Sequence, residues 1–143
     1  MPRTDDERFW SALRCVDDRP YDPRPAIERL EAGDRTAWAD FWCRLHREGR
    51  VCRASYAVIP DLVRIHKDRG AADFHTYAFA VMVEDARQTG RGPGLPPQIE
   101  REYDAAWREL ESLALTDFPE AKGGILVQSI IATLAMAIVG PVD

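Results

Sequence analysis

Three observations predict an all-α fold, a short solenoid-like stack of antiparallel helix pairs. Apolar residues recur at helical spacing in six or seven segments. Glycine- and proline-rich stretches separate these segments. No run of alternating apolar and polar residues is long enough to predict a strand. Because 143 residues is the size of one domain, we expect a single helical domain, with an N-terminal helix and loop over 1–35 and helix pairs over 36–140.

The first two helices are predicted from local signals. Thr4 and Glu7 have the spacing of a capping box, which favours a helix over residues 5–16. A proline-rich loop ends this helix, because proline cannot continue it. Pro25 can then open a short helix that stops at Gly33.

The remaining helices are expected over 34–48, 53–69, 72–88, 97–117 and 123–142. Asp34 is expected to cap the first of them, and Pro60 is expected to kink the second. The predicted core contains Trp38, Trp42, Tyr56, Val63, Val81, Leu110, Ile130 and Leu134.

The last of these segments carries no charged residue, so a membrane span has to be considered. Its larger apolar residues fall on one helical face, namely Val127, Ile130, Ile131, Leu134 and Ile138. A one-sided stripe favours a helix buried against its neighbours over a span. A membrane-tethered accessory protein that uses this helix is kept as an alternative.

Composition excludes some classes of function. The net charge is −5 and the basic residues are scattered, which argues against nucleic-acid binding. Three cysteines are an odd number and predict reduced thiols in a cytoplasmic protein. The N-terminus is acidic and has no apolar stretch of the secretory type.

No motif predicts catalysis or a cofactor. A conceivable metal set consists of Cys43, His46, Cys52 and His66, but it lacks the paired spacing of zinc sites. Phosphate-binding loops, nucleophile elbows and zinc-protease motifs do not occur. We therefore expect neither metal nor cofactor, and a binding protein in preference to an enzyme. The alternative is a small helical enzyme or ligand-binding domain with a pocket between the helices expected over 53–69, 72–88 and 123–142.

The string RVCRASYAVIPDLVRIH, residues 50–66, resembles the signature of bacterial HEAT-like repeat proteins. YDAAWRELESLAL, residues 103–115, followed by residues 125–140, is similar to a following repeat. The resemblance covers roughly residues 36–140 and implies an immunity protein of a polymorphic toxin system. Such a protein binds and neutralises a cognate toxin.

The acidic net charge suggests that a toxin partner would be basic. Carboxylates on loops, or without a basic residue four positions away, are the expected recognition residues, with one aromatic anchor among them. These are Asp17, Asp18, Tyr21, Asp22, Asp61 and Glu84. Asp61 and Glu84 are expected to project from neighbouring helices and to share a face.

Overall fold

The computed structural model describes residues 6–139, with side chains up to residue 136. This part is all-α and contains no strand, only two isolated β-bridges. Its α-helices are α1 (Glu7–Ser11), α2 (Arg24–Glu31), α3 (Ala37–Arg44), α4 (Arg53–Ala57), α5 (Ile59–Arg69), α6 (Phe74–Thr89), α7 (Glu100–Asp117) and α8 (Gly124–Val139). Two 3₁₀ turns are η1 (Pro97–Ile99) and η2 (Phe118–Glu120). The predicted all-α class is confirmed, whereas the solenoid-like stacking of antiparallel helix pairs stays a prediction.

The helix expected over 53–69 is present but divided. Val58 is both the C-cap of α4 and the N-cap of α5. Pro60 lies in the first turn of α5, where its missing N–H costs no helical hydrogen bond. Gly70 ends α5 in the left-handed conformation, with φ of 69°. The expected kink is therefore a complete break.

Two helices begin later than expected because carboxylates form hydrogen bonds ahead of them, and the same two helices also end earlier than expected, at Ser11 and Arg44. Asp6 accepts a hydrogen bond from the backbone N–H of Arg8, so α1 begins at Glu7. Thr4, the expected cap, lies outside the described residues. Asp34 accepts a hydrogen bond from the N–H of Thr36 before α3 begins, so it forms the turn ahead of the helix.

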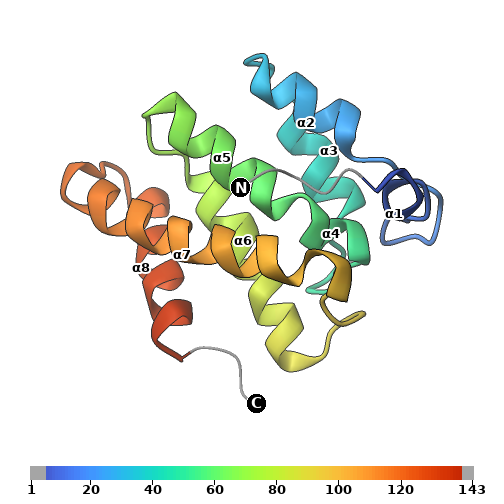
Figure 1. Cartoon of the computed structure of the whole chain (residues 1–143). Coiled ribbons are helices and arrows are strands. Elements are labelled where there is room, and N and C mark those ends of the chain that lie inside the picture. Colours follow the sequence, from blue (N-terminus) through green and yellow to red (C-terminus); the bar gives the residue numbers. More distant parts are fainter. Residues whose placement is uncertain (1–5, 140–143) are drawn as a thin grey trace.

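The helices pack in pairs that are not always consecutive in the chain. α2 packs against α3, α7 packs against α5, and α8 packs against both α6 and α7. In Figure 1, α5 and α7 lie side by side and pass in front of α6. A single hydrophobic cluster, running from Phe9 in α1 to Ile130 in α8, joins the N-terminal helices to the rest.

The predicted core positions are mostly right. Trp38, Tyr56, Val63, Leu110 and Ile130 are buried. The other three predicted core residues, Trp42, Val81 and Leu134, are only partly buried. Of these, Trp42 and Leu134 pack against the cluster.

The terminal helix α8 is oriented differently from the expectation. Its buried residues are Ile130 and Thr133, whereas Ile131 is 50% exposed. The side chain of Ile138 lies outside the described residues. The orientation follows from packing, since α8 lies against α6 and α7 on one side only. None of the helices in the described part has the length and apolar character needed to cross a membrane.

Candidate functional site

Two of the predicted recognition residues are buried, which corrects the expectation that they project from the surface. Asp61 is 4% exposed, and its Oδ1 accepts a hydrogen bond from Arg64 at 3.0 Å. Glu84 is 5% exposed and accepts hydrogen bonds from Arg87 at 2.9 Å and from the hydroxyl of Tyr103 at 2.8 Å. In both cases the arginine stands three positions later, a spacing that also brings side chains together on a helix. Counting only neighbours four positions away missed these pairs.

The three loop aspartates remain at the surface, but each faces an arginine. Asp17, Asp18 and Asp22 lie 3.6, 3.9 and 2.7 Å from Arg19, Arg14 and Arg24, respectively. Exposed pairs of this kind contribute little to stability. They do neutralise the loop, so it does not present a bare acidic patch to a basic partner.

Tyr21, the expected aromatic anchor, folds back onto the protein. Its ring packs against the core cluster, and the guanidinium of Arg44 lies 6.0 Å from the ring centre. Its hydroxyl is buried without a hydrogen-bond partner among the described residues. Burial raises the pKa of this hydroxyl to about 12. An anchor for a partner needs an accessible ring, so this expectation is corrected.

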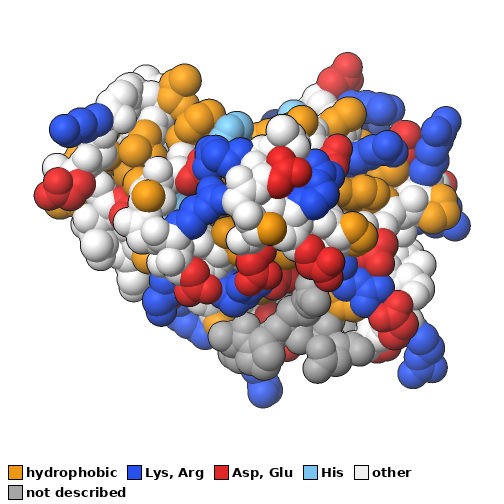
Figure 2. All heavy atoms as spheres, turned by 90° about the horizontal axis from the view of Figure 1, so that it is seen from above, with side chains coloured by type: hydrophobic (Ala, Val, Ile, Leu, Met, Phe, Trp, Pro, Cys, Tyr) orange, Lys and Arg blue, Asp and Glu red, His pale blue; other side chains and the backbone are white. Residues whose placement is uncertain are grey.

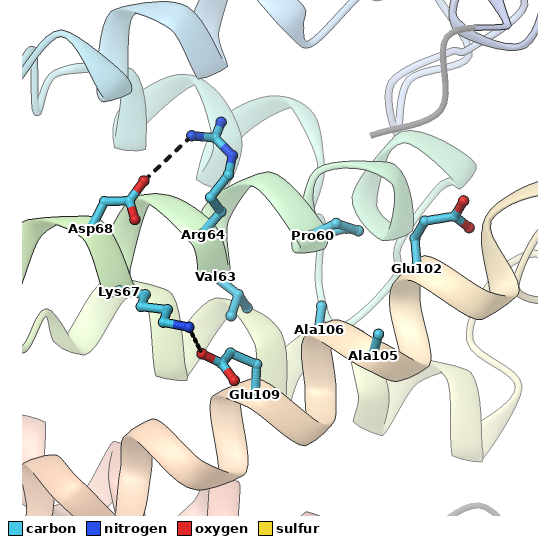
Figure 3. Close-up of a pocket in the computed structure, with 9 residues that line it drawn as sticks. All are labelled: Pro60, Val63, Arg64, Lys67, Asp68, Glu102, Ala105, Ala106 and Glu109. Carbon is cyan, nitrogen blue, oxygen red and sulfur yellow. Dashed lines mark ion pairs between the residues drawn. The ribbon is translucent and has the colours of Figure 1, made fainter. Parts of the chain in front are cut away.

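The structure instead shows a groove between α5 and α7, with a volume of about 330 Å³ (Figure 3). Its floor is apolar and consists of Pro60 and Val63 from α5 and Ala105 and Ala106 from α7. Its rims are charged: Arg64, Lys67 and Asp68 stand on α5, and Glu102 and Glu109 stand on α7. The pocket expected in the ligand-binding alternative lay between α5, α6 and α8, whereas this groove lies between α5 and α7.

Helical periodicity explains why these residues line one groove. On α5 the lining residues Pro60, Val63, Arg64 and Lys67 follow the i, i+3, i+4, i+7 pattern. On α7 the pattern repeats with Glu102, Ala105, Ala106 and Glu109. Alanines at the two middle positions of α7 leave space between the helices. The alanine pair flanked by two glutamates is the signal in the sequence that could have indicated this site.

The two ends of the groove differ in charge pairing. At one end, Lys67 Nζ lies 2.6 Å from Glu109, and this hydrogen bond raises the pKa of the lysine. Arg64 lies 2.6 Å from Glu31 on α2 and 3.8 Å from Asp68, so it is turned away from the floor. At the other end, Glu102 forms no ion pair with any described residue. Figure 3 shows Glu102 separated from the paired end by the apolar floor.

Further carboxylates continue along α7 beyond Glu102. Glu100 and Glu111 are exposed, Asp104 is half-buried, and none of the three forms an ion pair within residues 6–136. Figure 2 shows acidic side chains set among basic ones along the lower edge of the view, the side on which α5 and α7 lie. On α7, Glu100 and Asp104 line a hollow together with Arg101 and Arg108, so the acidic side chains there are interspersed with basic ones.

The residues of the conceivable metal set are not brought together. Cys43 is exposed, whereas Cys52 is buried and its thiol contacts Ser55 at 3.3 Å. His46 accepts a hydrogen bond from the N–H of Gly49. Across the described residues, no three His, Cys, Asp or Glu side chains form a group that could hold a metal ion.

A buried polar cluster joins three helices without opening a site. The hydroxyl of Tyr77 on α6 donates to Asp117 at 2.5 Å, and His66 on α5 lies 2.9 Å from the same carboxylate oxygen. Burial raises the pKa of Tyr77 well above its ordinary value, and the hydrogen bond to Asp117 raises it further. With Tyr77 and His66 both buried, the cluster fixes the end of α7 against α5 and α6.

No protein-family model matches the sequence, and neither a curated protein nor a solved structure matches it. The class is therefore defined by fold and site alone. The described part of the chain is an all-α protein with an apolar-floored groove, and the carboxylate at one end of the groove forms no ion pair with a described residue.

Proposed function

We propose that the chain is a protein-binding module whose α5–α7 groove accepts a basic side chain of its partner. The observation that carries this proposal is the position of Glu102, an unpaired carboxylate at the open end of an apolar floor. Long basic side chains have two parts that suit such a groove, because an aliphatic stem packs on apolar surface while the charged head stays polar.

At the paired end of the groove, the chain itself makes the kind of contact that we propose for the partner. There, Lys67 of the chain itself reaches across the groove from α5 to Glu109 on α7, at 2.6 Å. A partner lysine or arginine would make the equivalent contact seven residues earlier on α7, at Glu102. The stem would lie over Pro60 and Ala105, which line the intervening floor. An arginine would gain further from a two-bond contact with the carboxylate.

The charge of the chain supports a basic partner. The net charge is −5, and α7 carries six acidic residues against two basic ones, Arg101 and Arg108. Such a surface accelerates encounter with a positively charged protein and fixes its orientation more than it adds bulk affinity. The HEAT-like resemblance of residues 36–140 gives the finer proposal: an immunity protein of the cytoplasm that neutralises a cognate basic toxin.

The test is co-expression with the product of the neighbouring gene, followed by co-purification and a growth assay for toxicity. The informative variant is Glu102→Lys, which reverses the charge at the open end of the groove. Its matched control is Glu28→Lys, an exposed glutamate on α2 that forms no ion pair among the described residues. We expect Glu102→Lys to slow association at least about tenfold at low salt, and the control to change it little.

Two results would decide against the proposal. If the chain neither binds nor neutralises the neighbouring product, the immunity function is wrong. If it binds but Glu102→Lys and Glu28→Lys behave alike at low and high salt, the partner does not use the groove.

A further inference from the structure

Four large apolar side chains are exposed at the end of the molecule where α7 passes into α8. They are Leu115 at 62%, Phe118 at 45%, Ile125 at 63% and Ile131 at 50% exposed. We refer to these four residues as the apolar end face. Figure 2 shows hydrophobic side chains grouped at the left of that view, the end that carries α8 in Figure 1. Together they expose on the order of 400 Å² of apolar surface, which is within the range of the largest patch on a typical monomer, and such patches are often functional.

The helix beneath this face carries no charge. Every residue of α8 is apolar or neutral, and its exposed positions up to residue 136 are Gly124, Ile125, Gln128, Ile131 and Ala135. Solvent-facing helix surfaces ordinarily carry charged residues, since these are favourable in water. The inner side of α8 is already used, because Ile130 and Thr133 are fully buried against the protein. The exposed residues therefore do not belong to the core of this chain.

We propose that the apolar end face binds a second copy of this chain around a twofold axis. In a twofold interface the same patch meets itself, so a patch with a net charge would repel its own copy. The whole chain carries a net charge of −5, which opposes self-association through most of its surface. The uncharged face of α8 is the exception, and two such faces meet without repulsion.

The area of the apolar end face and the charges at its rim are also compatible with a second copy of the chain. A stable dimer buries about 800 Å² on each partner. The four apolar side chains provide about half of that, and the neutral Gln128 and Ala135 extend it along α8. Glu120 and Lys122 are exposed at the turn before α8 and carry opposite charges. This rim carries no net charge, so it does not repel its own copy.

Other occupants fit this face less well. An uncharged surface offers a basic protein no electrostatic steering. A membrane surface attracts helices whose apolar face is bordered by lysines and arginines. Here the exposed charges next to the face are Glu120 and Lys122, one of each sign, so the border is not basic.

The proposal is tested by measuring the molar mass of the full chain by light scattering and sedimentation over a concentration series. We expect a dimer that dissociates on dilution. Ile125→Glu and Ile131→Glu should each raise the dissociation constant at least about tenfold, because each buries a carboxylate in the interface. Both positions are at least half exposed, so both variants should fold, as circular dichroism will verify.

The matched control is Ala39→Glu, an exposed position on α3 at the other end of the molecule (Figure 1). It should leave the dimer unchanged. A monomer at all concentrations, or a dimer that both glutamate variants leave intact, would overturn the proposal. A monomer that sediments with phosphatidylcholine–phosphatidylserine vesicles would overturn it in favour of a membrane surface.

Discussion

Tyr56 and Tyr21 provide a test of the structure because their hydroxyls differ in hydrogen bonding. The hydroxyl of Tyr56 donates a hydrogen bond to the carbonyl of Pro93 at 2.8 Å, whereas the hydroxyl of Tyr21 is buried with no partner among the described residues. The same substitution to phenylalanine should therefore have opposite effects at neutral pH. Tyr56→Phe should lower the free energy of unfolding by about 1 kcal/mol, because Pro93 is exposed and water can replace the lost donor. Tyr21→Phe removes an unsatisfied polar group and should leave stability unchanged or raise it by up to about 1 kcal/mol.

Alkaline pH adds a second contrast. Burial raises the pKa of Tyr56 from its ordinary value of 10.0 to about 12. The unfolded chain then loses its phenol proton first, so the stabilisation is fully present below pH 10 and is lost as the pH rises toward 12. For a shift of this size the wild-type protein loses about 1 kcal/mol from Tyr56 by pH 11. Tyr56→Phe lacks this loss, so its deficit should vanish near pH 11 and reverse above it.

The assay is urea unfolding followed by tryptophan fluorescence at pH 7, 9 and 11 for the wild type and both variants. Absorbance of the phenolate at 295 nm reports the titration directly. Equal destabilisation by the two variants at pH 7 would refute the assigned hydrogen bonding. A deficit of Tyr56→Phe that stays the same at pH 11 would refute the link between burial and alkaline stability.

Three further substitutions test other parts of the structure by thermal and urea unfolding. Ser55→Ala should lower the free energy of unfolding by about 2–3 kcal/mol. The fully buried hydroxyl of Ser55 donates to the carbonyl of Leu45 and accepts from the N–H of Cys52, and both groups would lose their partner. A cost below about 0.5 kcal/mol would contradict this. Ile130→Asp should cost several kcal/mol because it buries an unpaired charge; wild-type stability would show that α8 does not pack as described. Asp73→Ala should cost about 1 kcal/mol at pH 7 because Asp73 caps α6. Burial opposes ionisation of Asp73, but the hydrogen bonds that it accepts lower its pKa below 3.8, so its contribution is present above about pH 4 and lost in more acidic solution. A cost of Asp73→Ala that is as large at pH 2.5 as at pH 7 would argue against this.

The sequence by itself determined the helices, because their signals are local. Spacing of apolar residues, prolines at helix starts and glycines at helix ends act within a few residues of one another. Pro60 marked the break between α4 and α5, and Gly70 marked the end of α5. Positions such as Trp38 and Leu110 were assigned to the core for the same reason, since a strong apolar stripe has to be buried somewhere.

Which face of each helix meets which neighbour was decided by the tertiary structure alone. Glu84 became an interior residue because Tyr103, nineteen positions away, provides a hydrogen-bond donor from α7. Ile131 became exposed because α8 is covered by α6 and α7 on one side only, and no local pattern selects that side within a uniformly neutral helix. The α5–α7 groove likewise exists only because alanines on α7 come to lie opposite Pro60 and Val63. Such contacts depend on packing between distant segments, whereas the helices themselves depend on neighbours along the chain.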